Sequence, residues 1–210
     1  HPMVKAATAK VADISKAHKV LGGDGESEGL GFVPTLDLYR AYDPSPMASA
    51  GHDFFLACQT AAEWAAKASD KEKYSVTFET KYGPVILRGG ADDTAPLSEA
   101  FLVIDTGGND TTFNAARAAS AARPFAVHID TAGKDQYLSD PALASVKVEK
   151  WEGRKSGSGS GPASAQLGIS VLIDSAGDDL YRSHRPAFGS ARMGCSMLLD
   201  KGFHIYLTAD

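Results

Sequence analysis

A run of apolar residues that ends in aspartate recurs along the chain. The three clearest copies are residues 125–130, 169–174 and 195–200, which end at the lead aspartates Asp130, Asp174 and Asp200. A Ser-Ala pair stands ten and nine residues before each of these aspartates. A fourth copy, residues 101–105, ends at Asp105, and a degenerate first copy occupies residues 84–88. Such self-similarity predicts stacked structural units.

Each of the first four copies leads into a turn that contains glycine and acidic residues. These turns occupy residues 89–93, 107–110, 132–135 and 176–179. The lead aspartates of residues 105 and 130 are 25 positions apart, and those of residues 174 and 200 are 26 apart. That length suits one turn of a solenoid with two or three short strands. The predicted fold is therefore mainly β, a β-solenoid or β-helix of repeats of about 25 residues.

Within a copy, large apolar side chains stand one, three and five positions before the lead aspartate. Phe125, Val127 and Ile129 therefore share one face of their strand, and we expect that face to form the core. The opposite face begins with a small residue, namely Ala126, Ser170 or Ser196. This small residue allows another layer to approach closely. The last turn, residues 201–204, has lost its acids, as is typical of a terminal repeat.

Helical periodicity precedes the repeats. Residues 3–21 predict an amphipathic helix that stops at a Gly-Gly pair, and residues 52–68 predict a second helix with one apolar face. Residues 1–73 are therefore expected to form an N-terminal helical cap over the end of the stack. Period-two alternation begins at residue 74, so residues 74–210 are expected to form the repeat domain.

The interval between Asp130 and Asp174 is 44 residues, about 19 longer than a repeat. The expected insertion lies near residues 140–159. Residues 146–151 alternate like an exposed hairpin strand, and residues 155–161 are Gly/Ser loop material.

An α/β fold is the alternative. The strands at residues 101–105 and 125–130, joined by a helix over the alanine-rich residues 114–122, could form a β-α-β unit with residues 105–108 as a phosphate loop. That loop matches neither the P-loop nor the dinucleotide fingerprint, and the corresponding later segments contain glycine and proline. The stacked-repeat fold is favoured, and the α/β fold implies a protein that binds a phosphate-bearing ligand.

Composition narrows the partners. The chain has 210 residues, 21 basic and 26 acidic side chains and a net charge of −5, with no basic run, so nucleic acid is not expected. No apolar stretch is long enough to span a membrane, and no signal peptide is visible. The chain begins at His1-Pro2, which predicts either a processed mature product or a trimmed or tagged start. Cys58 and Cys195 are expected to be buried free thiols.

Stacking would bring the acids of successive turns to the spacing of neighbouring strands, about 4.8 Å. Carboxylates at that distance repel one another by about 1 to 4 kcal/mol, depending on the local dielectric. Calcium relieves such repulsion, because it takes six to eight oxygen ligands from carboxylates, carbonyls and amides. The expected ligands are Asp92, Asp93, Asp105, Asn109, Asp110, Asp130, Asp135, Asp174, Asp178 and Asp179. The competing interpretation is that these carboxylates only accept hydrogen bonds from backbone amides of their turns.

The turns at residues 107–111 and 176–180 resemble halves of the glycine and aspartate nonapeptide of calcium-binding β-roll repeats in secreted bacterial proteins. Residues 82–210 also resemble the Ile-Asp-x-Gly-Gly-x-Asp-x-Tyr repeats of large uncharacterised bacterial proteins. The period here is 25 rather than nine, and Lys134 and His204 replace acids, so two or three calcium sites are expected. The β-roll resemblance implies a secreted, periplasmic or cell-surface protein.

The predicted function is a non-catalytic repeat domain that uses calcium to order its turns. It would present a face to a protein or polysaccharide and could associate through its ends. The alternative is a β-helix polysaccharide lyase, in which Lys134 or Arg182 acts beside the aspartates. No catalytic spacing specifies that enzyme. Tyr137, Tyr181 and Tyr206 are expected to form a packing ladder.

Overall fold

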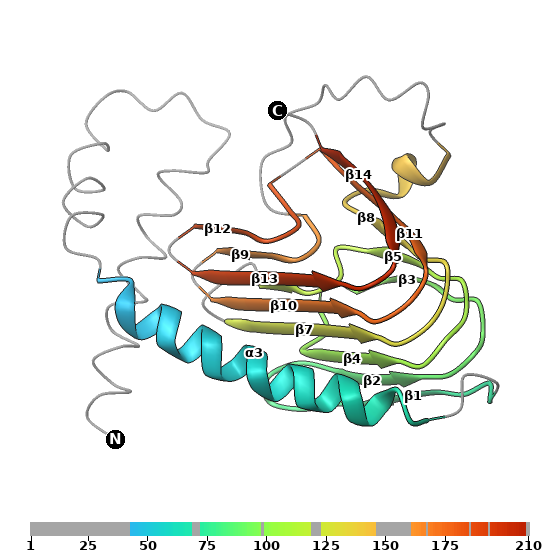
Figure 1. Ribbon diagram of the computed structural model, residues 1–210, viewed down its shortest axis with the longest axis horizontal. Helices are drawn as coiled ribbons and strands as arrows, with labels where there is room; N and C mark the ends of the chain where they lie inside the picture. Colours follow the sequence, from blue (N-terminus) through green and yellow to red (C-terminus); the bar gives the residue numbers. More distant parts are fainter. Residues whose placement is uncertain are drawn as a thin grey trace.

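The computed structural model describes residues 43–68, 72–97, 99–118, 123–145, 161–166, 168–184, 186–192 and 194–208. Within these ranges the chain is mainly β, with one α-helix ahead of three sheets (Figure 1). This confirms the predicted mainly β class and its preceding helix. The helix predicted at residues 3–21 and the strand predicted at 146–151 lie outside the described residues. The start of the expected insertion is the 3₁₀ helix η1 (Pro141–Ser145).

Sheet A holds the repeated apolar strands. Its order is β1 (Ser75–Phe78), β2 (Val85–Arg88), β4 (Leu102–Asp105), β7 (Phe125–Asp130), β10 (Ile169–Asp174) and β13 (Cys195–Asp200). Strand β1 is antiparallel to β2, and each later neighbour is parallel to the strand before it. The register pairs the lead aspartates with one another, with Arg88 opposite Asp105 at the first copy. The sequence alignment of the copies is thus also their spatial alignment.

Two smaller sheets complete each repeat. Sheet B consists of β3 (Thr94–Pro96), β5 (Thr111–Phe113), β8 (Gln136–Leu138), β11 (Asp178–Ser183) and β14 (Phe203–Thr208). Sheet C consists of β6 (Arg117–Ala118), β9 (Ser164–Gln166) and β12 (Ser190–Arg192). The chain visits sheets A, B and C in that order in the repeats that begin at β4, β7 and β10. Every pairing in sheets B and C is parallel.

The α/β alternative is wrong for the described residues. It required a helix over residues 114–122, of which the described residues 114–118 instead form a turn and strand β6. Parallel strands usually need helical crossovers. Here the crossover is made by short strands of two further sheets.

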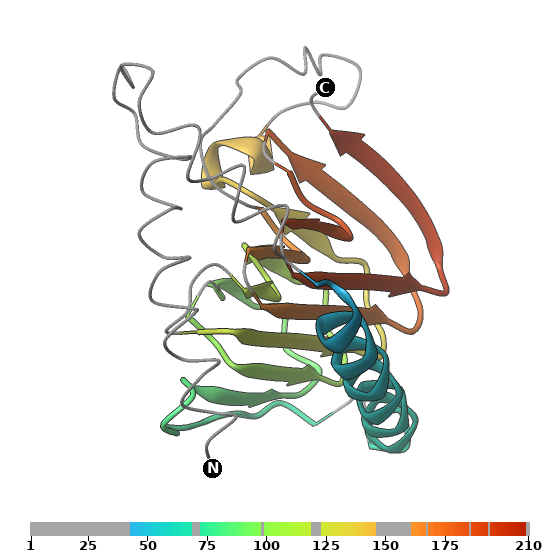
Figure 2. The ribbon, with the colours of Figure 1, turned by 90° about the vertical axis from the view of Figure 1, so that its left-hand side faces the viewer.

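Helix α3 (Ser45–Ala65) lies across sheet A (Figures 1 and 2). Cys58, Ala62 and Ala65 on the helix pack against Val127 and Val171 on the sheet. The face predicted to be core is therefore buried, but α3 covers it from outside the space enclosed by the three sheets. The predicted cap spans residues 1–73, of which 1–42 lie outside the described residues, and its described helix α3 contacts the face of β7, β10 and β13.

The opposite face of sheet A looks toward sheets B and C. Val103 and Leu172 on this face pack with Tyr137 and Tyr181 from sheet B. The small residues that begin this face do permit close approach, as predicted. The Ser170 hydroxyl donates to the backbone carbonyl of residue 116, and that of Ser196 donates to the carbonyl of residue 163 at 2.8 Å.

Among the described residues, no helix combines the length and apolar character required to cross a membrane. Cys58 and Cys195 are both free thiols. Both belong to the cluster between α3 and sheet A, as expected for thiols that serve as small apolar side chains.

Candidate metal centre

Two columns of acidic residues meet at the bend between sheet A and sheet B. The first column contains the lead positions at the ends of the sheet A strands, namely Asp105, Asp130, Asp174 and Asp200. The second column lies where the strands of sheet B begin and contains Asp93, Asp110, Asp135 and Asp179. Within sheet B, Thr94 pairs with Thr111, and Leu180 pairs with Gln136, so the turns preceding them stack in register. The stacking of the acidic turns therefore follows from the register of both sheets.

Burial separates these columns from ordinary surface acids. Six of the aspartates are at most 2% exposed, namely Asp105, Asp110, Asp130, Asp135, Asp174 and Asp179. A carboxylate removed from water is strongly disfavoured unless it is hydrogen-bonded, paired, protonated or bound to a metal. Each of the six must therefore find one of these forms of compensation.

In the second column, Asp110, Asp135 and Asp179 each accept a hydrogen bond from the neighbouring repeat at one carboxylate oxygen. The backbone N–H of Asp93 donates to Asp110 Oδ1 at 2.6 Å, that of Asp110 to Asp135 Oδ1 at 2.6 Å, and that of Asp135 to Asp179 Oδ1 at 2.8 Å. These bonds continue the backbone ladder through the turns, where strand pairing stops. The carboxylates thus link successive repeats without any metal.

Lead carboxylates accept hydrogen bonds from their own turns. The N–H of Gly107 donates to Asp105 Oδ1 at 3.3 Å, and the N–H of Ala132 donates to Asp130 Oδ1 at 3.2 Å. The same bond joins Gly202 to Asp200 at 2.8 Å. The competing interpretation of the acids, as caps of backbone amides, is therefore correct for one oxygen of these residues.

The second oxygens remain without a hydrogen bond among the described residues. They are Oδ2 of Asp105, Asp110, Asp135 and Asp179, and Oδ1 of Asp174. Three groups of carboxylates have oxygens within 4.8 Å of one another. The groups are Asp93, Asp105 and Asp110; Asp110, Asp130 and Asp135; and Asp135, Asp174 and Asp179. These buried triads could hold metal ions, and successive triads share Asp110 or Asp135.

The pKa values of the buried aspartates reflect the same crowding of carboxylates. Burial, reinforced by the charges of Asp130 and Asp110, raises the pKa of Asp105 to about 9. Burial and the charge of Asp130 raise the pKa of Asp135 to about 10. Burial likewise raises the pKa of Asp174 to about 8. A metal-free column thus holds protons at neutral pH, and a bound cation would displace them.

Glycine makes the bends of the columns possible. Gly133 and Gly177 have φ of 156° and 153°. A side chain at Gly177 would overlap the carbonyl oxygen of Gly133, and one at Gly133 would overlap that of Gly108. The turns therefore stack backbone on backbone, which brings their carboxylates into one column.

Three of the predicted ligands lie outside the triads. Asp92, Asn109 and Asp178 have exposed side chains one position before the second column. The N–H of Asn109 donates to Asp92 Oδ1 at 2.8 Å, and the N–H of Lys134 donates to Asn109 Oδ1 at 3.1 Å. These residues form a second, outer row of bonds between repeats. The structure does not bring them to the buried oxygens.

Sequence reasoning missed three neighbours of the column. Arg88 Nε lies 3.7 Å from Asp93 Oδ2. His128 is completely buried, with Nε2 3.7 Å from Asp130 Oδ2, and burial lowers its pKa to about 3. The Tyr137 hydroxyl donates to Asp174 Oδ2 at 2.8 Å. Position provided a signal for two of them, since Arg88 replaces a lead aspartate and His128 occupies a position that is aliphatic in the other copies.

The basic residues named for the lyase alternative lie elsewhere. Lys134 is exposed in the outer row, and the Arg182 Nη1 donates to the carbonyl of Leu143 in η1 at 2.7 Å. Tyr137 and Tyr181 stack with ring centroids 4.8 Å apart, as the packing ladder predicted. The side chain of Tyr206 is not described.

Comparison with known proteins adds no relative. The chain matches no family model. Searches of curated proteins and of solved structures also give no significant match. What the columns can do therefore follows from their own geometry, which offers clustered, buried carboxylate oxygens.

Proposed function

We propose that this protein is a β-solenoid whose inner aspartate columns bind up to three calcium ions, and that the ions lock its repeats into a rigid, non-catalytic binding scaffold. The observation that carries the proposal is the set of three overlapping buried triads with unsatisfied carboxylate oxygens. The parallel, in-register pairing of the repeated strands in all three sheets, with only β1 antiparallel among the described strands, supports the solenoid.

The size of the triads suits calcium. The oxygens of each triad lie within 4.8 Å of one another. Three evenly spaced oxygens that bind one calcium at about 2.3–2.6 Å lie up to about 4.5 Å apart, so a small side-chain adjustment would bring each triad onto one ion. Each carboxylate of a triad offers one oxygen, and backbone carbonyls or waters would complete the six to eight ligands of calcium. Magnesium requires a tighter octahedron at about 2.0–2.1 Å and retains its waters, which a buried site accommodates poorly.

Charge also matches three divalent ions. The triads contain seven different aspartates, and Arg88 lies beside Asp93 at their first end. Seven carboxylates and one guanidinium leave six negative charges, which three divalent ions neutralise. The shared carboxylates of Asp110 and Asp135 lie between neighbouring ions and reduce their mutual repulsion.

In this arrangement, the ordered stacking of the repeats depends on bound calcium. Without the ions, the carboxylates retain protons or repel one another; with them, each ion ties together two successive repeats. Binding to the native state alone stabilises it by about 2.7 kcal/mol per site at a calcium concentration of 100 times Kd. The resemblance of the turns to calcium-binding β-roll repeats favours a secreted, periplasmic or cell-surface setting, where calcium modules work at about 10⁻⁴–10⁻³ M.

The test compares two neighbouring aspartates. Thermal unfolding at pH 7.5 is followed by circular dichroism with 5 mM calcium and with chelator, for the parent chain, Asp179→Asn and Asp178→Asn. We expect calcium to raise the Tm of the parent chain by about 5 °C or more. Asp179→Asn, inside the third triad, should lose about a third or more of that increase, whereas Asp178→Asn, on the exposed outer row, should retain it.

An equal Tm with calcium and with chelator would contradict the metal sites. An equal loss in the two variants would instead indicate non-specific screening of surface charge. Calorimetric titration adds the stoichiometry, for which we expect two to three ions per chain.

A further inference from the structure

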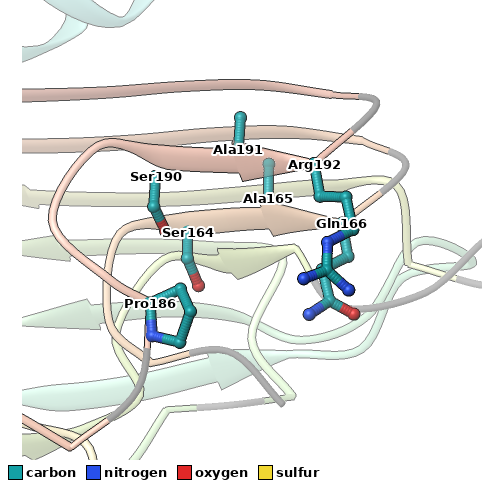
Figure 3. Close-up of a pocket in the computed structure, with 7 residues that line it drawn as sticks. All are labelled: Ser164, Ala165, Gln166, Pro186, Ser190, Ala191 and Arg192. Atoms are coloured by element: carbon teal, nitrogen blue, oxygen red, sulfur yellow. The ribbon is translucent and has the colours of Figure 1, made fainter. Parts of the chain in front are cut away.

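Sheet C carries a second kind of site. A hollow of about 120 Å³ lies on the strands β9 and β12 (Figure 3). Its walls are formed by Ser164, Ala165, Gln166, Pro186, Ser190, Ala191 and Arg192. Two of the Ser-Ala pairs that recur in the sequence lie in this sheet, one in β9 and one in β12. The hollow lies at the end of the repeat opposite the acidic turns.

Alternation along the strands places polar side chains on the open face. Ala118 and Ala165 are buried against Ala126 of sheet A, so their strand positions point inward. Figure 3 shows Ala165 and Ala191 on one side of the sheet, with Gln166 and Arg192 together on the other. Ser164 and Ser190 pair in register, with Ser164 buried and Ser190 half-buried at the wall of the hollow. The face combines hydroxyl, carboxamide and guanidinium groups.

The charge of this face is opposite to that of the molecule. The chain has a net charge of −5, yet none of the residues that line the hollow is acidic. Arg192 is exposed, and Arg117 occupies the position in register with Ser164 on the neighbouring strand β6. An arginine guanidinium recognises a carboxylate through two parallel hydrogen bonds. The hollow is therefore suited to an anionic group.

The other groups that line the hollow indicate the rest of the ligand that carries this anionic group. Ser164 is 1% exposed and its hydroxyl donates to the carbonyl of Gly161, so the hydroxyl that a ligand can reach is that of the half-buried Ser190. The Gln166 carboxamide can both donate and accept, and the Pro186 ring adds an apolar wall. Donors and acceptors of this kind, next to one cation, match a molecule that carries hydroxyls and one carboxylate.

We propose that this hollow is a subsite for one uronate residue of an acidic polysaccharide, with Arg192 holding the carboxylate and Gln166 and Ser190 facing the sugar hydroxyls. The site gives the scaffold its ligand class. It rests on the proposed binding role of the scaffold but uses none of the residues of the metal columns.

The experiment titrates the folded, calcium-loaded chain with trigalacturonate and follows backbone and side-chain amide resonances by NMR. We expect saturable binding that shifts the Gln166 side-chain amide. Arg192→Ala should weaken binding at least tenfold, and Arg192→Lys should weaken it less. Lys81→Ala, which removes one positive charge at the distant β1–β2 turn, should leave binding unchanged.

Neutral maltotriose and acetate distinguish the sources of any signal. Equal affinity for maltotriose would overturn the role of the carboxylate, and affinity for acetate equal to that for trigalacturonate would overturn the saccharide subsite. Undisturbed trigalacturonate binding in Arg192→Ala would also overturn the assignment. If calcium raises the Tm but trigalacturonate does not bind, only the proposed subsite is overturned, because the calcium-dependent rise in Tm is measured separately.

Discussion

At the scale of single residues, the buried aspartates each use their two oxygens differently. One oxygen generally accepts a hydrogen bond that holds a turn or links two repeats, and the other faces a neighbouring carboxylate. Asp174 differs, because its Oδ2 accepts a hydrogen bond from the hydroxyl of Tyr137 instead of from a backbone N–H. Tyr137 is therefore more than a packing residue, although the sequence predicted only its stacking on Tyr181.

Tyr137→Phe tests this bond. The substitution keeps the ring but leaves a buried carboxylate oxygen without its donor, so we expect it to lower the free energy of unfolding by about 1–3 kcal/mol. Tyr82→Phe is the matched control, because the Tyr82 side chain is 48% exposed. Urea unfolding of both variants with chelator gives the comparison. Equal stability of the two would show that the hydroxyl of Tyr137 contributes nothing.

The residues of the columns were predictable to an unequal extent. Asp105, Asp130 and Asp174 recur at fixed positions, so the alignment of copies predicts their column. Arg88 and His128 break the pattern of the copies, and such departures become informative only when the register is known. The exposed positions of Asp92, Asn109 and Asp178 could not be distinguished either, because inner and outer acids are adjacent in the turn.

At the scale of elements, helix α3 depends on one close contact. The predicted helix began at residue 52, whereas α3 spans Ser45–Ala65, because Pro46 fits its first turn. Gly51 is buried, and a side chain there would overlap the Sγ and Cβ of Cys195 on β13. Neither the orientation of the helix nor this contact was visible in the periodicity, which indicates a buried face but not what covers it.

Gly51→Ala separates packing from helix propensity. In an exposed helix this change would stabilise by about 1 kcal/mol. Here we expect destabilisation by about 1–3 kcal/mol, because the methyl group must displace Cys195. Chemical denaturation measures the sign, with Ser49→Ala at an exposed position of the same helix as the control. A more stable Gly51→Ala variant would show that α3 is not tightly docked on sheet A.

At the scale of the whole molecule, the sequence predicted the mainly β class but not the route of the chain. Copies of 25 and 26 residues specify stacking, because equivalent residues in parallel strands must pair. The third sheet has strands of only two or three residues, too short to produce a readable alternation. Because no solved structure matches the chain, this route of the chain has to be tested through the behaviour of the protein in solution.

One such behaviour is the response of the metal-free protein to pH. The pKa values of Asp174, Asp105 and Asp135 are raised to about 8, 9 and 10 in the folded chain, chiefly by burial. The unfolded chain therefore releases these protons first as the pH rises, so the folded state binds more protons and loses stability. The loss begins above the ordinary aspartate pKa of about 4 and continues to about pH 10.

We expect the free energy of unfolding, measured by urea titration with chelator, to fall by at least about 3 kcal/mol between pH 5 and pH 8.5. Excess calcium should reduce or reverse this fall, because the ion binds the deprotonated form. A free energy of unfolding that rises with pH in chelator would show that the carboxylates are already compensated as anions.

The reversed direction of β1 gives the stack a polarity. A further repeat added before β2 would meet an antiparallel strand, whereas one added after β13 would find a parallel partner in the same orientation. Of the two edges of sheet A among the described strands, β13 is therefore the one that offers a repeat a parallel partner. Each unit added there would lengthen the molecule by one strand spacing, about 4.8 Å.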